Sequence, residues 1–349
     1  MTRRAAVLAG LGGWIPPMRV TNEDLAAQLD TTDEWITSRT GIRQRFVVGP
    51  GVSTSDIAVE AGRRALDSAG VSAVGLVVLA TSTPDHPCPA TAPEVASRLG
   101  LGEVPAFDVA AVCTGFVYAL ATAAGMVDTG IATSALVIGA DTFSTILDPR
   151  DRTTRAIFGD GAGAVVLRAG ERGERGALLG FDLGSDGTLA DLITMPAGGS
   201  EQRSSELAAD ESDFYLSMRG RPVFRHAVTR MSETSLRLAD RIGWPAPEID
   251  RLVAHQANIR ILTAVGGELG LPADRIVANL DRVGNTVAAS IPLALVDAVG
   301  SGELTAGHRV LLCGFGGGLT WGAVGLEFPE LPVQPLPGLA TRVLSTRTK

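Results

Sequence analysis

Short runs of consecutive apolar residues alternate along the chain with longer segments whose apolar residues recur at helical spacing. The runs LVVLATS, SALVIGAD, RLVAH and RVLLCGF begin at Leu76, Ser134, Arg251 and Arg309, and an earlier apolar stretch covers residues 5–11. Continuous apolar runs of this length are typical of strands that are buried on both faces of a parallel sheet. We therefore predict an α/β protein whose sheets are covered by helices.

The segments between these strands carry recognisable helix signals. Thr21 and Asp24 form a capping-box-like start for one helix, and Ser55 and Gly70 bracket a second helix. An apolar stripe at near-heptad spacing over residues 224–242 predicts a long helix that lies on a sheet. These helices are explained by packing and need no functional role.

The second half of the chain retraces the pattern of the first. Cys113 lies 37 residues after Leu76, and Asn285 lies 33 residues after Leu252. Each is followed by threonine and then by a segment that is apolar on nearly all sides, which is typical of a helix enclosed by other structure. We therefore expect Cys113 and Asn285 at equivalent helix starts, related by a pseudo-two-fold axis.

This internal similarity predicts two fused α/β halves, residues 1–172 and 173–349. The first half is expected to carry the nucleophilic cysteine, and the second half the catalytic histidine and asparagine. The tail from about residue 329 has four prolines and little periodicity, so we expect it to be loosely ordered.

Composition and charge narrow the class of protein. Hydrophobic residues make up 45% of the 349 residues and charged residues 19%, as in ordinary globular proteins. The net charge of −8 provides no basic surface for nucleic acid or an anionic membrane, and no run of about 18 apolar residues exists to span one. Three cysteines are too few for a disulfide framework or a thiolate metal site, so we predict a cytoplasmic protein.

Three polar residues stand where chemistry is expected. Cys113 opens a buried helix, whose positive end would stabilise a thiolate, although a single cysteine is more often an inert core residue. His255 ends a strand, where α/β folds place catalytic groups, whereas Asn285 alone fits a helix N-cap. Together they combine a nucleophile, an imidazole and an amide donor, a set that suits thioester chemistry.

Two glycine clusters are candidates for phosphate loops. GDGAG at 159–163 and GGG at 316–318 both run into predicted strands, whereas a phosphate loop runs from a strand into a helix. Close approach of the backbone is the better explanation, and an amide near Gly317 is predicted to face an oxyanion beside Cys113. The chain contains no HExxH motif, and we expect no metal site.

Six segments resemble β-ketoacyl-acyl carrier protein synthase III, a family of the thiolase superfamily. They are TTDEWITSRTGIRQR at 31–45, DVAAVCTGF around Cys113, DRTTRAIFGDGAGAVVL from Asp151, VAHQANIRI around His255, DRVGNTVAAS around Asn285 and FGGGLTWG from Phe315. They span Thr31 to Gly322 in the order that the family has. The resemblance implies a duplicated, five-layered αβαβα fold.

The resemblance also implies a mechanism. Cys113 would take the acyl group from an acyl-CoA, and His255 and Asn285 would hydrogen-bond the thioester oxygen of malonyl-acyl carrier protein as CO2 leaves. The backbone amides of Cys113 and Gly317 would form the oxyanion hole. The product would be a 3-oxoacyl-carrier protein that starts fatty acid or type II polyketide synthesis, and no cofactor is implied.

Further residues match positions that bind CoA in this family. Trp35 and Arg152 correspond to an aromatic residue and an arginine that sandwich the adenine, an arrangement that cation–ring stacking explains. Thr31 and Arg39 match positions along the nucleotide, and Asn258 matches a contact to the pantetheine arm. Without the motif, Trp35 would be an ordinary core aromatic residue.

The remaining implications concern partners. Arg225 and Arg260 match basic positions that dock the acidic carrier protein, and the family implies a homodimer. Cys88 matches a pocket-floor position, often phenylalanine, that reaches in from the neighbouring subunit. Its smaller side chain predicts room for a longer or branched starter.

Three other functions compete with this one. A related acyltransferase would pass the acyl group from CoA to a non-malonyl acceptor, and the sequence leaves this alternative open. A papain-like hydrolase also uses Cys, His and Asn, but it lacks the duplicated halves. A non-catalytic acyl-binding role is disfavoured by the intact set of Cys113, His255 and Asn285.

Overall fold

Two large sheets, each covered by helices, form the frame of the protein. The computed structural model describes residues 4–205 and 208–340. The larger sheet has the order β1-β7-β6-β4-β5, and the second has the order β11-β12-β13-β8. The larger sheet contains β1 (Arg4–Trp14), β4 (Val77–Ala80), β5 (Ala106–Val109), β6 (Ser134–Asp141) and β7 (Gly161–Glu171). The second contains β8 (Leu178–Ser185), β11 (Arg251–Ala254), β12 (Arg309–Gly316) and β13 (Thr320–Glu327).

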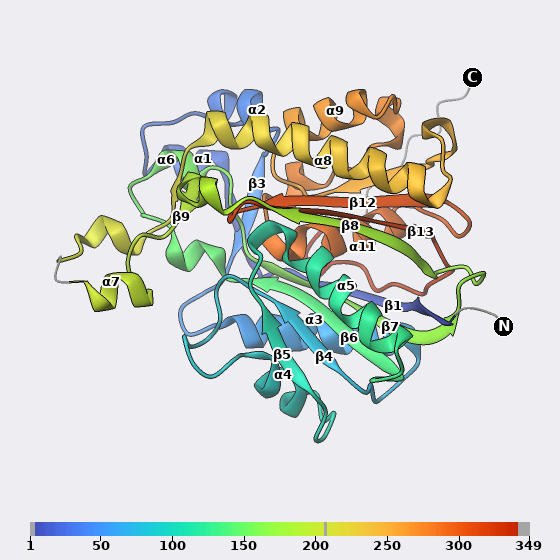
Figure 1. Ribbon diagram of the computed structural model, residues 1–349. Helices are drawn as coiled ribbons and strands as arrows, with labels where there is room; N and C mark the ends of the chain where they lie inside the picture. The colour runs from blue at the N-terminus through green and yellow to red at the C-terminus, as the bar shows by residue number, and fades with distance from the viewer. Residues whose placement is uncertain (1–3, 206–207, 341–349) are drawn as a thin grey trace.

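Helices form the other three layers (Figure 1). Helices α5 (Gly115–Asp128) and α11 (Ser290–Gly300) lie between the two sheets, which explains why both are apolar on nearly all sides. Helices α3 (Thr54–Ala69) and α4 (Ala92–Arg98) cover the outer face of the larger sheet, and α8 (Gly220–Ile242) and α9 (Ile259–Glu268) cover the second. This arrangement confirms the predicted five-layered αβαβα fold.

Shorter elements lie around this frame. They are β2 (Met18–Thr21), α1 (Asn22–Ala26), α2 (Asp33–Thr40), β3 (Gln44–Val47), α6 (Arg152–Arg155), β9 (Ile193–Thr194), α7 (Ser200–Ser204), β10 (Ser217–Met218) and α10 (Leu280–Val283). Thr21 and Asp24 form the predicted capping box of α1. Within the described part of the chain, no helix has both the length and the apolar character needed to cross a membrane.

The duplication is real, but its register differs from our prediction. Strands β6 and β12 begin 175 residues apart, and so do helices α5 and α11. The 3-10 turns η1 (Val112–Thr114) and η7 (Val287–Ala289) keep the same offset, and both begin with a valine of positive φ, 46° and 51°. Cys113 therefore corresponds to Ala288, and its predicted equivalence to Asn285 is wrong by three residues. The connections from β4 to η1 and from β11 to η7 have nearly equal lengths, 31 and 32 residues, so the error arose from pairing the two polar residues that precede a threonine.

The ends of the two halves also depart from symmetry. At the position that corresponds to β5, the second sheet has an isolated bridge between Leu252 and Ile276 in place of a strand. The division at residues 172 and 173 stays a prediction; β7 ends at Glu171 and β8 begins at Leu178.

The tail is held more firmly than expected as far as it is described. Leu336 is 5% exposed and packs close to Gly13 of β1. The carbonyl of Pro335 accepts a hydrogen bond from Arg64, and that of Ala340 accepts one from Arg282. The expectation of a loosely ordered tail is therefore wrong for residues 329–340, and residues 341–349 lie outside the described part.

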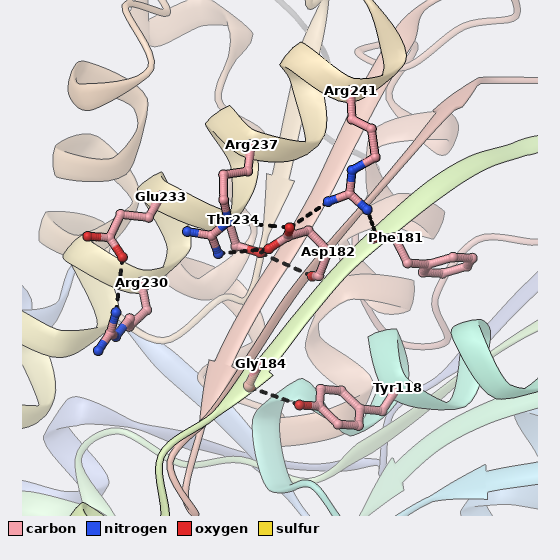
Figure 2. Close-up of polar contacts among 9 residues, drawn as sticks. All are labelled: Tyr118, Phe181, Asp182, Gly184, Arg230, Glu233, Thr234, Arg237 and Arg241. Carbon is pink, nitrogen blue, oxygen red and sulfur yellow. Dashed lines mark hydrogen bonds and ion pairs between the residues drawn. The ribbon is translucent and has the colours of Figure 1, made fainter.

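A largely buried carboxylate holds α8 on the second sheet (Figure 2). Asp182 of β8 accepts hydrogen bonds from Arg237 at 2.8 Å and Arg241 at 2.6 Å, and its side chain is only 11% exposed. Thr234 of α8 donates to the same carboxylate at 2.5 Å. On the opposite face, the hydroxyl of Tyr118 in α5 donates to the carbonyl of Gly184 at 2.9 Å. Strand β8 is thereby tied to a helix on each side.

We predict that Asp182→Asn lowers the free energy of unfolding at pH 7 by about 1–3 kcal/mol, because charge-assisted hydrogen bonds are lost. Burial opposes ionisation of Asp182, yet the bonds from Arg237 and Thr234 outweigh it and lower the pKa of the carboxyl. The contribution is therefore complete above the unfolded pKa of about 3.9 and is lost as the pH falls through the lower folded pKa. Urea denaturation at pH 7 and at about pH 3 measures the difference.

Glu233→Gln provides the matched control, since its pair with Arg230 is exposed on the same helix. We expect this change to cost less than about 0.5 kcal/mol. Equal losses in both variants would contradict the anchoring role of Asp182.

Candidate active site

Cys113, His255 and Asn285 line one largely apolar cavity of about 50 Å³. Cys113 lies in η1 before α5, His255 directly follows β11, and Asn285 lies between α10 and η7. The chain thus brings together the three predicted residues from its two halves. The remaining lining residues are Val112, Phe143, Phe158, Ile193, Met218, Val223, Ala227, Met231, Ala257, Ile261 and Phe315.

The backbone around Cys113 is held by close packing against the end of β12. A Cβ on Gly316 would lie 2.8 Å from the amide nitrogen of Cys113, a distance that real Cβ atoms do not reach. Only glycine therefore allows this approach. Gly317, the predicted oxyanion-hole residue, packs instead against Ile193, and its role stays a prediction. The GGG run in the sequence was the signal for Gly316, which sequence reasoning did not single out.

Burial decides the protonation of the site. Desolvation and the nearby charge of Asp141 raise the pKa of the Cys113 thiol, so the unliganded site holds a neutral thiol. Our expectation that the helix end holds a thiolate here is therefore wrong, because burial outweighs the helix end. Desolvation also lowers the pKa of His255 to about 3, so its imidazole is neutral at pH 7.

Local hydrogen bonds orient both polar side chains of the second half. The amide of Val287 donates to Oδ1 of Asn285 at 3.0 Å, which leaves the Nδ2 group of Asn285 as its donor. Nδ1 of His255 lies 2.6 Å from the hydroxyl oxygen of Ser290. Asn285 therefore offers a donor, and His255 its Nε2 atom, to a cavity whose walls are otherwise apolar.

A second, wider cavity of about 1,100 Å³ adjoins the first, since Met218 lines both. We call it the vestibule. Trp35, Arg39 and Asn258 lie on its wall, together with Arg225 and Arg260. Sequence reasoning missed Arg221, which also lines the vestibule and is exposed.

The predicted CoA-binding residues differ in their position: some gather around Trp35, whereas Thr31 lies apart from the vestibule. Arg39 and Arg152 lie over the ring of Trp35, at 4.7 and 5.2 Å from its centre, in direct contact with it, and the role of Trp35 and Arg152 in sandwiching an adenine stays a prediction. Arg152 is also paired with Asp30 at 3.1 Å. Thr31 does not line the vestibule, and its buried hydroxyl has no hydrogen-bond partner among the described residues.

The side chain of Asn258 has structural partners in the unliganded protein. Its amide donates to the carbonyl of Arg39 at 2.8 Å, and its oxygen accepts from the amide of Arg260 as the N-cap of α9. Arg260 lies over the ring of Phe224, 5.8 Å from its centre. Asn258 therefore joins α2 to α9 across the vestibule wall.

Cys88 does not line the cavity of its own chain. It is exposed and lies in the loop that precedes α4. This location leaves its predicted contact with a neighbouring subunit open. In the described ranges, no cluster of His, Cys, Asp and Glu side chains is arranged to hold a metal ion.

Two family models match the chain. The model for 3-oxoacyl-(acyl-carrier-protein) synthase III matches residues 107–187, and the model for the C-terminal part of this enzyme matches residues 239–328. The first match contains Cys113, and the second contains His255 and Asn285.

Individual relatives agree along nearly the whole length. The chain is 61% identical over 327 residues to β-ketoacyl-(acyl-carrier-protein) synthase III 5 of Streptomyces coelicolor, covering 94% of this chain and 98% of the relative. The crystal structure of 3-oxoacyl-(acyl carrier protein) synthase III, FabH, from Pseudomonas aeruginosa is similar with a TM-score of 0.89 and 52% identity, covering 94% and 99% of the two chains.

A priming β-ketosynthase from a polyketide biosynthetic pathway is similar with a TM-score of 0.87 and 33% identity, over 95% of this chain and 98% of that one. The same fold therefore extends to a relative that is named for polyketide biosynthesis. On the combined strength of the matched models and the full-length relatives, the chain belongs to the 3-oxoacyl-(acyl-carrier-protein) synthase III family.

Proposed function

We propose that this protein catalyses the decarboxylative condensation of an acyl-CoA with malonyl-acyl carrier protein, with Cys113, His255 and Asn285 as its catalytic residues. Family membership supports the reaction, which initiates fatty acid or polyketide synthesis. The observation that carries the residue assignment is that one nucleophile and two side-chain donors line a single apolar cavity.

The first half-reaction transfers the acyl group to Cys113. The thiol sulfur bonds to the acyl carbonyl carbon, the bond to the sulfur of CoA breaks, and the proton of Cys113 ends on the released CoA thiol. Backbone amides of Cys113 and Gly317 are the proposed donors to the tetrahedral oxyanion. Burial suits this step, because a neutral acyl thioester replaces a neutral thiol in the apolar cavity.

The second half-reaction forms the carbon–carbon bond. The β-carboxylate of the malonyl group leaves as CO2, and its bonding electrons pass to an enolate. His255 and Asn285 donate hydrogen bonds to the enolate oxygen, where negative charge develops. The enolate carbon attacks the acyl carbonyl, the bond from that carbon to the sulfur of Cys113 breaks, and the departing thiolate takes up a proton from water. The overall reaction therefore consumes the two substrates and one proton from the solvent.

The vestibule is the proposed route for both substrates. Trp35, Arg39 and Arg152 provide an aromatic surface and positive charge for a nucleotide, with Thr31 and Asn258 as the further predicted CoA contacts. Arg225 and Arg260 are exposed at the vestibule, where they would attract an acidic carrier protein to a chain whose net charge is −8.

A homodimer is part of the proposal. Strand β5 pairs with β4 on one side only, which makes it an edge of the larger sheet among the described residues. Pairing of this edge with a second copy would continue the sheet and cover an edge that is otherwise open.

Cytoplasmic location is also proposed, with the three free cysteines as its support.

The central experiment is intact-protein mass spectrometry after incubation with a panel of acyl-CoAs, together with measurement of CO2 release from malonyl-carrier protein. We expect the wild type to gain one acyl group and then to release CO2, and Cys113→Ala to gain none and to form no 3-oxoacyl product. Acylation of the wild type without CO2 release would instead favour the acyltransferase that uses a non-malonyl acceptor.

We predict that Trp35→Ala raises KM for acyl-CoA about tenfold, because a cation–π and stacking surface worth roughly 1–2 kcal/mol is removed. Steady-state kinetics with acyl-CoA and with the corresponding acyl-pantetheine test this role. The truncated substrate lacks the nucleotide, so its kinetics should be unchanged in the variant. A similar loss with both substrates would indicate damage to the active site rather than a lost nucleotide contact.

We predict that Cys88→Phe narrows starter selectivity towards short acyl groups, because the larger ring would fill the floor of the neighbouring subunit's pocket. The ratio of kcat/KM for a long or branched acyl-CoA to that for acetyl-CoA should fall at least about tenfold, the scale of one or two misplaced methylenes. Equal ratios in wild type and variant would remove Cys88 from the acyl pocket.

A further inference from the structure

The imidazole of His255 has one hydrogen-bond partner that the reaction as described does not use. Nδ1 lies 2.6 Å from the hydroxyl oxygen of Ser290, the first residue of α11. His255 is 3% exposed and Ser290 is 1% exposed, so water does not compete for this bond. The contact joins the strand end that carries His255 to the central helix that follows Asn285.

Two arrangements of protons satisfy this distance. In one, the serine hydroxyl donates to Nδ1 and the imidazole carries its single proton on Nε2. In the other, Nδ1 carries the proton and donates to the serine oxygen, which leaves Nε2 as an acceptor. Because burial keeps the imidazole neutral, only one of its nitrogens is protonated at pH 7.

The surroundings of Ser290 select the first arrangement. Over the described ranges, the hydroxyl of Ser290 has no hydrogen-bond partner other than Nδ1 of His255. If Nδ1 donated to the serine oxygen, the hydroxyl proton would be left buried without an acceptor, which costs about as much as a lost hydrogen bond. If the hydroxyl donates to Nδ1, both groups are satisfied.

We propose that Ser290 is a positioning residue that fixes His255 in the tautomer with the proton on Nε2, so that the imidazole acts as a hydrogen-bond donor. This inference rests on the proposed function of His255 in stabilising the enolate. It parallels the bond from Val287 to Oδ1 of Asn285, which reserves Nδ2 of Asn285 as the second donor. Each proposed donor is thus oriented by one hydrogen bond from a residue that does not touch the reacting atoms.

If Ser290 has this role, the two half-reactions should depend on it to different extents. An Nε2–H imidazole does not accept the proton of Cys113, so transfer of the acyl group to Cys113 should depend little on Ser290. Decarboxylation needs the Nε2 donor and should depend on it strongly. A residue with a merely structural role would affect both steps together.

The test compares Ser290→Ala with Ser290→Thr, which retains a hydroxyl. Ser290→Ala should lower the rate of CO2 release from malonyl-carrier protein about ten- to a hundredfold, in line with the loss of part of an oxyanion donor, while acylation of Cys113 stays within about twofold of wild type. Ser290→Thr should recover most of the decarboxylation rate. Ser232→Ala on α8 is the control. It also removes a buried hydroxyl, but the hydroxyl of Ser232, unlike that of Ser290, has no hydrogen-bond partner among the described residues.

Nitrogen-15 NMR of histidine-labelled protein reads the tautomer directly. We expect the wild type to show His255 protonated on Nε2 and Ser290→Ala to show a mixture, with assignment from the loss of one signal in His255→Ala. A wild-type signal from the Nδ1–H tautomer overturns the proposal, and so does an unchanged tautomer in Ser290→Ala. Should the wild type release no CO2 at all, the proposed function fails, whereas the NMR result still decides the role of Ser290.

Discussion

The buried carboxylate of Asp141 joins the two halves of the molecule at the active site. One oxygen accepts a hydrogen bond at 2.7 Å from the amide of Ser82 in the first half, and the other accepts one at 3.0 Å from the amide of Ala288 in the second. Asp141 ends β6, and Ala288 lies in the turn that follows Asn285. This bridge therefore holds the turn that follows Asn285 against the end of β6 in the first half.

Close backbone contact reinforces the bridge and has an electrostatic consequence. A Cβ on Gly139 would lie 2.3 Å from the carbonyl of Ala288, so β6 and the turn approach closely only because residue 139 is glycine. Burial raises the pKa of Asp141 to about 7 against its hydrogen bonds, and its charge in turn raises the pKa of the Cys113 thiol. Asp141 therefore joins the two halves and also favours a neutral thiol at Cys113.

A largely apolar cavity lies beside a vestibule that is lined by several arginines. The cavity walls are largely apolar, and the side chains of His255 and Asn285 are held by hydrogen bonds of 2.6 and 3.0 Å, an arrangement that suits the proposed stabilisation of developing charge. The vestibule concentrates exposed arginines although the whole chain is acidic. Under the proposed function, recognition of charged carriers and carbon–carbon bond formation would take place in adjacent spaces of opposite character.

The amino-acid sequence by itself determined the strands, the enclosed central helices and the kinds of residue in the site, because these follow from local periodicity and from motifs that survive as contiguous segments. Only the tertiary structure decided the 175-residue register, since in the second half the polar residue followed by threonine, Asn285, lies three residues before the position equivalent to Cys113. It also decided the neutral thiol of Cys113 and the contact between His255 and Ser290, 35 residues apart in sequence. Protonation depends on burial and on neighbours from distant segments, and neither is encoded in the local pattern that a sequence displays.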